Sequence, residues 1–326
     1  MKTFKTFILF AFASLALLAN AAPSVLYPVI VEGRWGFVDQ SGNTVVNPQF
    51  ERAEPFAGGL AAVRLSRWGY VDGSGKIVIN PQFDEAGPFS EGLAAVKYRG
   101  RYGYVNPEGK YVINPQFDKA GPFAEDRAAF KAKGGYGYID KTGAIVINPQ
   151  FQSAEVFSEG LAQIEQGGRV GYIDPAGKMI INPQFDKAGS FSEGLAALKM
   201  GRRWGFIDKT GAIVINPQFE EVYSFVKGLA PARLGGRWGF IDPTGHFVIN
   251  PQFEDAGSFS EGLARVRLGK RWGFVDSTGK LYINPQFDDV MPFADGLAQF
   301  KLSDGIARSK IGYVDLRGKY IWNPTK

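Results

Sequence analysis

The side chains that most often carry catalysis or hold metal ions are scarce in this sequence. It contains one histidine, His246, and no cysteine. Ser-His-Asp catalysis would depend on His246, and no partner pattern for such a triad accompanies it. A zinc site needs three or four nitrogen or sulfur ligands, which this composition does not supply. We therefore expect His246 to be an exposed turn residue, and we predict no catalytic residue, no metal site and no cofactor.

Carboxylates are plentiful, and a pair of them could cleave a glycosidic bond. Acids recur, however, at two fixed places in the repeated units of the chain, whereas catalysis normally needs one asymmetric site. Calcium is disfavoured as well, because the recurrent Asp-x-x-Gly turns lack dense oxygen ligands and Asn106 replaces the aspartate in one copy. We assign structural or surface roles to these acids, which are Asp84, Glu91, Asp118, Asp186, Glu193, Glu254, Glu261, Asp288 and Asp295.

A basic residue precedes the recurrent tryptophan position in eight of nine copies, with Gly135 as the exception. In a stacked array these side chains would lie roughly 10 Å apart and form a positive row that attracts an anionic partner, such as an acidic envelope glycan. The structural alternative is that each cation stacks on a neighbouring ring or pairs with the acid of the adjoining loop. The candidate binding residues are Arg34, Arg67, Arg101, Arg169, Arg203, Arg237, Arg271 and Lys310.

These positions recur because the whole chain is a tandem repeat. The motif Asn-Pro-Gln-Phe begins at intervals of 33 residues once and 34 residues six times, and a frayed ninth copy ends at Pro324. Such a fixed period marks a repeat array. The asparagines of the motif are Asn47, Asn80, Asn114, Asn148, Asn182, Asn216, Asn250 and Asn284.

Each unit is too strongly interrupted for helices. Proline stands in the middle of every unit, several glycines surround it, and the segments between them are short and rich in β-branched and aromatic residues. We predict three strands per unit, for example over 195–199, 204–208 and 212–215. The Asp-x-x-Gly turn joins the second strand to the third, since Asp bonds its own backbone and Gly supplies a positive φ.

The second and third predicted strands are apolar on both faces, as expected of strands buried on both sides. Each meander would then be sandwiched between its neighbours. Propellers usually have four to eight blades of four strands, and no strand is left over here to close a ring. We therefore predict an all-β array of about nine 34-residue three-stranded antiparallel meanders, open and stacked like a solenoid. A closed, propeller-like ring is the alternative.

The N-terminal residues 1–21 have the pattern of a secretory signal peptide. Lys2 and Lys5 precede a short apolar run and the small-residue sequence Ala19-Asn20-Ala21, after which we expect cleavage. Residues 22–326 would form one repeat domain, with a short insertion near 303–309. We expect an exported monomer, periplasmic or secreted, with no membrane span after cleavage. Without the two lysines the formal charge falls from +5 to +3, which does not suggest a nucleic-acid partner.

The repeat resembles a known family. Trp-Gly at Trp35, Trp68, Trp204, Trp238 and Trp272, continued as Gly-[Phe/Tyr]-[Val/Ile]-Asp-x-x-Gly and Asn-Pro-Gln-Phe, is similar to the WG-repeat family of bacterial proteins. The resemblance extends from about Val29 to Pro324. It implies an exported protein of binding or scaffolding type and supplies no reaction. Four copies depart from the pattern at the tryptophan position, with Tyr102, Tyr136, Val170 and Ile311.

From these features we predict a non-enzymatic binding or scaffolding protein of the bacterial cell envelope or medium, which recognises a protein or glycan along an extended repeat surface. A purely structural envelope protein is one alternative. A hydrolase with a site in an irregular copy is another, and the most irregular stretches are Glu165–Val170 and residues 303–309.

Overall fold

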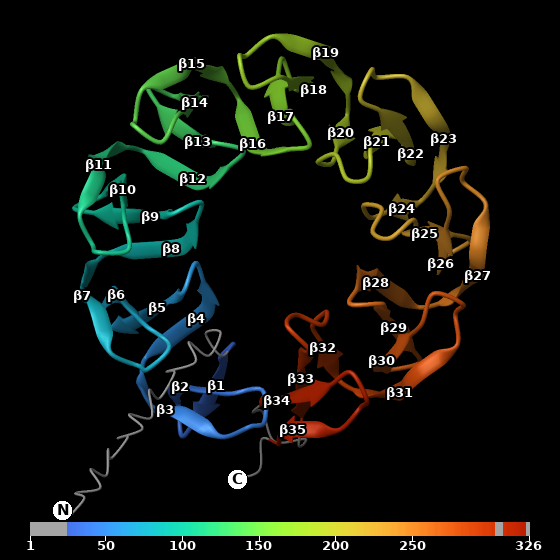
Figure 1. Cartoon of the computed structure of the whole chain (residues 1–326). Helices are drawn as coiled ribbons and strands as arrows, with labels where there is room; N and C mark the ends of the chain where they lie inside the picture. The colour runs from blue at the N-terminus through green and yellow to red at the C-terminus, as the bar shows by residue number, and fades with distance from the viewer. Residues whose placement is uncertain (1–24, 304–308, 324–326) are drawn as a thin grey trace, which may run out of the picture.

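The chain forms a closed ring of nine antiparallel sheets around a central opening (Figure 1). The computed structural model describes residues 25–303 and 309–323. The predicted signal peptide and residues 304–308 of the predicted insertion lie outside this part. We number the sheets as blades 1 to 9 in chain order. Blade 1 has three described strands and each of the others has four. The all-β prediction is confirmed, and no helix in the described part is long and apolar enough to span a membrane.

Blades 2 to 9 begin with a strand at one edge of the sheet, followed by a central strand. The first strands are β4 (Arg52–Ala57), β8 (Glu85–Ser90), β12 (Lys119–Ala124), β16 (Ser153–Ser158), β20 (Lys187–Ala188), β24 (Glu221–Val222), β28 (Asp255–Ser260) and β32 (Asp289–Val290). The second strands are β1 (Tyr27–Val31), β5 (Leu60–Leu65), β9 (Leu93–Tyr98), β13 (Arg127–Ala132), β17 (Leu161–Gln166), β21 (Leu195–Met200), β25 (Ala230–Leu234), β29 (Leu263–Leu268) and β33 (Leu297–Ser303).

The third strand carries the Trp-Gly motif, and the fourth follows the outer rim of the ring (Figure 1). The third strands are β2 (Arg34–Val38), β6 (Arg67–Val71), β10 (Arg101–Val105), β14 (Gly135–Ile139), β18 (Arg169–Ile173), β22 (Arg203–Asp208), β26 (Arg237–Ile241), β30 (Arg271–Val275) and β34 (Ser309–Asp315). The fourth strands are β3 (Thr44–Phe50), β7 (Ile77–Phe83), β11 (Tyr111–Phe117), β15 (Ile145–Phe151), β19 (Met179–Phe185), β23 (Ile213–Phe219), β27 (Phe247–Phe253), β31 (Leu281–Phe287) and β35 (Tyr320–Trp322).

The Asp-x-x-Gly turns form at the predicted residues, and because each full blade has an additional strand at its start, they join the third strand to the fourth. In blade 6, Asp208 Oδ1 accepts the backbone N–H of Thr210 at 2.9 Å and that of Ala212 at 3.0 Å. Gly211 closes the turn with a φ of +89°. Asn106 plays the same part in blade 3, where its Oδ1 accepts the N–H of Lys110 at 2.9 Å. A turn role for the aspartate therefore accounts for the exchange of Asp for Asn.

The prediction of three strands per unit is wrong, because the long connection after Asn-Pro-Gln-Phe contributes a fourth. In blade 3 it forms β8, whose Glu85 and Ala86 pair with Lys97 and Val96 of β9. The prolines and glycines of this stretch suggested a loop. The strand lies at the edge of its sheet, however, where such residues are tolerated. In blades 6, 7 and 9 the same stretch pairs over only two residues.

The rim strand also continues further than predicted. We predicted that this strand ends before Asn-Pro, whereas β23 extends through Asn216 and Pro217 to Phe219. Trp204 pairs with Phe219 and Phe206 with Ile215, so that three rim residues bulge opposite Gly205 alone. A bulge on an edge strand needs no N–H from the proline. The same register shift occurs in blades 1 to 8.

The core is built between blades rather than within them. Tyr104 and Ile113 of blade 3 form one buried cluster with Phe123 and Phe130 of blade 4. Tyr104 and Phe123 have ring centroids 4.9 Å apart. The rim strands, in contrast, are not buried on both faces as predicted: Ile215 is 2% exposed, but Val214 is 45% exposed. The strand lies at the perimeter, where only one of its faces meets a neighbouring blade.

The open solenoid is wrong, and the closed alternative describes the molecule. Blade 1 packs against blade 9 through a buried cluster that includes Tyr27, Val29, Leu297 and Tyr313. The Tyr313 hydroxyl donates to the Pro28 carbonyl oxygen at 2.8 Å, and the Tyr27 hydroxyl donates to the carbonyl of Asp295. Burial, with the nearby charges of Asp295 and Glu261, raises the pKa of Tyr27 to about 12, so that it stays a neutral donor.

Among the described residues, blades 1 and 9 exchange no strand at this interface, which we call the seam. The seam repeats the contact found between other blades, in which the turn glycine of one blade lies against the rim strand of the preceding one. A Cβ on Gly75 of blade 2 would lie 2.8 Å from Cγ2 of Val46 in blade 1, and one on Gly42 of blade 1 would meet Ile321 of blade 9. The ring therefore closes by face-to-face packing of blade 9 against blade 1. The prediction of an open array was wrong because it assumed that closure requires an additional strand.

Neighbouring blades are also joined by a carboxylate that we call the clamp. Glu193 lies in the turn between the first two strands of blade 6, and its carboxylate accepts the N–H groups of Lys227 at 2.5 Å and Gly228 at 2.9 Å in blade 7. Burial opposes ionisation of the clamp residue Glu159, but the Gly194 amide and Lys209 outweigh it and lower its pKa. The clamp acids are Glu91, Glu125, Glu159, Glu193 and Glu261.

Lys227 occupies the clamp position in blade 7, and we expect Lys227→Glu to supply the missing clamp to the turn amides of Glu261 and Gly262 in blade 8. Two charge-assisted hydrogen bonds should stabilise the ring by about 1 kcal/mol, measured by urea unfolding. The backbone is already suited to the change, because Lys227 has a φ of 52° and Glu193 has 54°.

Lys227→Ala is the control for this substitution, since it removes the lysine without adding a clamp. The pKa of the clamp carboxylates Glu91 and Glu159 is lowered in the folded state. The contribution of a clamp with such a shift is present above the ordinary glutamate pKa near 4.3 and is lost as the pH falls below it. Equal stability of the Glu and Ala variants at neutral pH would contradict the prediction.

Candidate functional site

The structure places the predicted basic row at the start of the third strands, where most of these side chains pair with an acid at the junction to the next blade. The partner lies 17 residues further along the chain. Arg67 is 2.6 Å from Asp84, Arg237 is 2.6 Å from Glu254, and Arg271 is 2.5 Å from Asp288. Arg203 lies 3.9 Å from Glu220, and the remaining two pairs are Arg101 with Asp118 and Arg169 with Asp186. Arg34 and Lys310 occupy the same strand position on β2 and β34.

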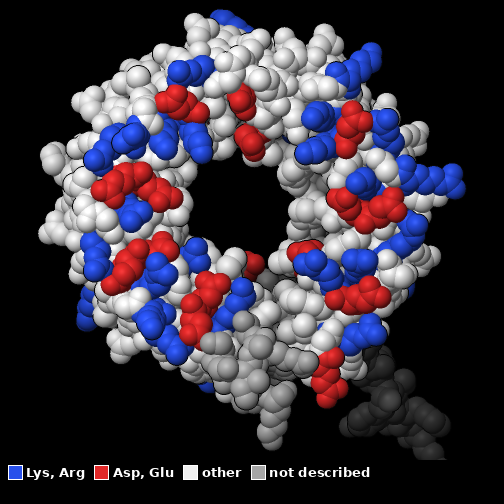
Figure 2. Space-filling model, turned by 180° about the vertical axis from the view of Figure 1, so that it is seen from behind, with Lys and Arg blue, Asp and Glu red and all other residues white. Residues whose placement is uncertain are grey.

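These pairs are consistent with the structural alternative for the row. The one unit without a basic residue, at Gly135, also lacks the acid, since Gln152 stands 17 residues later. The Gly100 amide and the Arg67 guanidinium hold the pKa of Asp84 below its ordinary value. Figure 2 shows that basic and acidic side chains lie in mixed groups around one face of the ring. The field of the six paired arginines is therefore largely offset by the acids beside them. Binding by the row stays a prediction.

The other residues with possible chemistry are dispersed. His246 is exposed in its turn, with Nδ1 2.7 Å from Thr244 Oγ1. Residues 165–170 form the ends of β17 and β18 and an ordinary Gly-Gly hairpin turn. In the part of the chain described, no three His, Asp or Glu side chains are grouped so that they could hold a metal ion.

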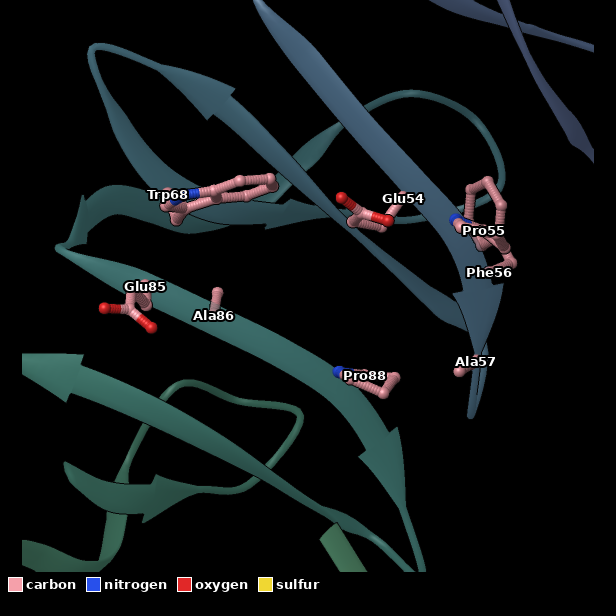
Figure 3. Close-up of a pocket in the computed structure, with 8 residues that line it drawn as sticks. All are labelled: Glu54, Pro55, Phe56, Ala57, Trp68, Glu85, Ala86 and Pro88. Atoms are coloured by element: carbon pink, nitrogen blue, oxygen red, sulfur yellow. The ribbon is translucent and has the colours of Figure 1, made fainter. Parts of the chain in front are cut away.

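An open cleft of about 450 Å³ lies between blades 2 and 3 (Figure 3). Its walls are mainly apolar. The indole of Trp68 extends from β6 towards the side chain of Glu54 on β4, and β8 of the next blade forms the opposite wall (Figure 3). The residues that define it are Glu54, Pro55 and Trp68 of blade 2 and Glu85, Ala86 and Pro88 of blade 3.

Two carboxylates lie at the cleft in different states. Glu85 is 2.8 Å from Lys97 Nζ and accepts the Tyr102 hydroxyl at 2.5 Å. The Lys97 hydrogen bond and then that of Tyr102 lower the pKa of Glu85, which is therefore ionised at neutral pH. Glu54 is exposed, and within the described residues it makes no ion pair or hydrogen bond through its carboxylate. The cleft thus combines an indole face with one paired and one free anion.

The same place is narrower or filled in other blades. Between blades 3 and 4, where Tyr102 replaces the tryptophan, the cleft holds about 170 Å³. In blade 7, Tyr223 stacks on Trp238 with centroids 5.1 Å apart and planes 3° apart, and Trp238 is only 3% exposed. Glu54 stands where blade 7 has Tyr223. Trp68, by contrast, is only half-buried.

Sequence reasoning identified Trp68 as part of the repeat signature but missed the cleft. The cleft lies between two units, and its walls come partly from the stretch that was taken for a loop. The available signal was the variation at one position among otherwise constant units, with Glu54, Gly87, Tyr223, Gly257 and Met291 at the third place of the first strand. A position that changes size within a regular repeat marks a place where the packing changes.

Comparison with known proteins identifies the repeat family and supports the ring architecture. A family model described as "WG containing repeat" matches residues 35–66, 68–102, 102–135, 136–169, 171–203, 204–238, 238–272 and 272–305. A crystal structure of a eukaryotic initiation factor is similar to the ring with a TM-score of 0.66 and 12% identity, over 92% of this chain and 95% of that one. At this identity the likeness shows the fold alone, a propeller-type ring.

Two further structures are more distant. Hsv2p of Kluyveromyces lactis has a TM-score of 0.43 and 10% identity, over 72% of this chain and 93% of its own. A study of two prolyl endopeptidases supplies a chain with a TM-score of 0.45 and 11% identity, over 91% of this chain and 49% of its own. Neither value supports an argument about fold or function. No curated protein matches this sequence.

Proposed function

We propose that this chain, which belongs to the WG-containing repeat family and has an open aromatic cleft between blades 2 and 3, is a non-enzymatic binding and scaffolding protein of the bacterial cell envelope or medium. The observation that carries this proposal is the half-buried Trp68 in a cleft of about 450 Å³. Binding sites are typically concave and mainly apolar, with a few polar groups that fix orientation. The cleft has this composition.

The partner we infer is a protein that inserts a side chain into the cleft while the rest of it lies on the ring. Trp68 offers a rigid apolar surface together with Pro55 and Pro88, which also line the cleft. Aromatic residues are typical anchors of protein interfaces. An envelope location rests on the signal-peptide pattern of residues 1–21. The glycan partner considered for the basic row is the competing outcome in the experiment below.

Affinity capture from envelope extract with tagged residues 22–326 tests this function. We expect wild-type protein to retain a partner that Trp68→Ala loses. Trp204→Ala is the matched control, because Trp204 holds the same strand position in blade 6 and lines no described cleft comparable to that of blade 2. Both variants remove one half-buried indole, so a general loss of stability would affect them alike.

A second variant separates the cleft from the basic row. Arg203, Arg237 and Arg271 are changed together to Gln, which we expect to leave capture of the partner and the melting temperature nearly unchanged, since exposed ion pairs contribute little. Loss of salt-sensitive binding to envelope polyanions in this triple variant, with capture independent of Trp68, would favour the glycan partner and refute the cleft.

A further inference from the structure

The cleft between blades 8 and 9, which is equivalent to the open cleft between blades 2 and 3, is filled by a side chain of the same protein. This side chain indicates which chemical group the open cleft could bind. Between blades 8 and 9, the guanidinium carbon of Arg265 lies 4.8 Å from the ring centroid of Trp272. Its Nη1 donates to the Val290 carbonyl oxygen at 2.8 Å and is 3.9 Å from Asp289 Oδ1. The cation therefore contacts an indole face, a carbonyl oxygen and a carboxylate.

The cleft between blades 2 and 3 has a counterpart for each of these three contacts. Trp68 corresponds to Trp272, as the pairing of each with the second strand of its blade shows. Glu85 and Ala86, which begin the first strand of blade 3, correspond to Asp289 and Val290 of blade 9. The lysine beside the carboxylate is repeated too, since Lys97 is 2.8 Å from Glu85 and Lys301 is 3.4 Å from Asp289.

The difference is the side chain that fills the space. Arg265 pairs with Phe274 of the third strand, and the equivalent pair in blade 2 is Ala62 with Tyr70. Ala62 is 3% exposed and belongs to the same buried cluster as Trp68 and Ala86. In the described structure no cation of the ring itself lies over Trp68, whereas Arg265 and Arg267 both lie over Trp272. Trp204, whose blade also has alanine at this position, is covered by Lys199 from a different position of the second strand.

A second difference adds negative charge. Gly257 leaves room for Arg265, because a Cβ at Gly257 would lie 2.9 Å from Nε of that arginine. Blade 2 has Glu54 at this position, which blocks the path of an arginine from within the blade and places a free carboxylate beside Trp68 (Figure 3). A guest must therefore come from solvent, and it meets two carboxylates where Arg265 has one.

We propose that the cleft between blades 2 and 3 binds the guanidinium of an arginine side chain presented by a partner protein. The inference rests on the proposed function and names the chemistry of its site. A guanidinium is planar and weakly hydrated, stacks on indole, and has five N–H donors for the two carboxylates and the Ala86 carbonyl. A neutral sugar would leave the excess negative charge uncompensated.

Nuclear magnetic resonance of the mature chain labelled with 5-fluorotryptophan tests the proposal, because six tryptophans give six separable signals. The probe is Nα-acetyl-arginine N-methylamide, and its uncharged isostere, the citrulline derivative, is the control. We expect the arginine probe to shift the Trp68 signal saturably and the citrulline probe to bind roughly tenfold more weakly. Equal affinities for the two probes would overturn the proposal.

Three variants exchange the features of the two clefts. Ala62→Arg combined with Glu54→Gly reproduces blade 8 in blade 2, and we expect it to abolish the Trp68 shift, whereas Glu54→Gly alone only weakens it. Arg265→Ala empties the blade 8 cleft, so that the Trp272 signal should begin to respond to the probe. An undiminished Trp68 response in the double variant would contradict the inference.

These experiments distinguish a failure of the proposed binding function from a failure of the guanidinium proposal. A captured partner that depends on Trp68 but is not displaced by the arginine probe would keep the binding function and reject the guanidinium. Specific probe binding without any Trp68-dependent partner would keep the chemistry of the cleft and reject the proposed function.

Discussion

Gly205→Ala should destabilise the ring by about 3 kcal/mol, the upper end of the range for overpacked substitutions. The cause is the rim bulge, whose backbone lies directly over this glycine. An added Cβ would lie 2.7 Å from the Pro217 nitrogen and 2.8 Å from the Asn216 carbonyl carbon, and it would also meet the Ile215 carbonyl oxygen. Backbone atoms in a paired strand cannot rotate away as a side chain does. Urea unfolding monitored by tryptophan fluorescence measures the loss.

Gly189→Ala is the matched control in the same blade. A Cβ there would meet only the Cβ of Ala197, at an ordinary distance of 3.8 Å, and other blades have Glu54 or Tyr223 at this position. We expect this variant to unfold at nearly the wild-type urea concentration. Similar losses at Gly205 and Gly189 would show that the bulge does not explain why glycine follows tryptophan.

Tyr313→Ala should destabilise the ring by about 3–5 kcal/mol, as large-to-small aromatic substitutions in a core do. Tyr313 is 4% exposed, its ring centroid is 5.4 Å from that of Tyr27, and its hydroxyl bonds across the seam. The substitution leaves a cavity where the first and last blades meet. Hydrogen exchange should show the loss of protection in β1, β2, β33 and β34 first.

Tyr172→Ala provides the comparison, because Tyr172 holds the same strand position in blade 5 and its hydroxyl bonds to Gly189 of blade 6 at 2.7 Å. A closed ring predicts similar losses at the two tyrosines, since both lie between packed blades. An open array would leave Tyr313 at a free end and would make its substitution far less costly. That result would contradict the seam.

Much of the architecture follows from single residues. The 34-residue period, the exclusion of helices by proline and glycine, and the Asp-x-x-Gly turns are local properties, and the structure has them where the sequence predicts them. Most acids beside the basic row and the clamp acids Glu91, Glu193 and Glu261 were also assigned structural or surface roles, because an acid that recurs in unit after unit does not make one asymmetric active site. The clamp acids Glu125 and Glu159 were not singled out. These inferences need no knowledge of distant contacts.

The features that were missed depend on neighbours. Whether the stretch after Asn-Pro-Gln-Phe is a loop or a strand is decided by pairing with the next segment, as Glu85 with Lys97. Closure depends on the angle between successive blades, which no single unit reveals, and on the packing of Tyr27 against Tyr313, far apart in sequence. The Trp68 cleft depends on two adjacent units and on the small side chain of Ala62, where blade 8 has Arg265.

The seam has a consequence for the history of the gene. Gly42 lies against the backbone of Ile321 in the rim strand of blade 9, and Gly75 lies against the side chain of Val46 in the rim strand of blade 1. Blade 1 is therefore packed on both sides, like the blades in the middle of the chain. A coding sequence that opened at a different repeat would specify the same circle of contacts. Unequal recombination between such similar repeats inserts or removes whole blades. Any number of blades at which the first and the last pack face to face gives a closed ring.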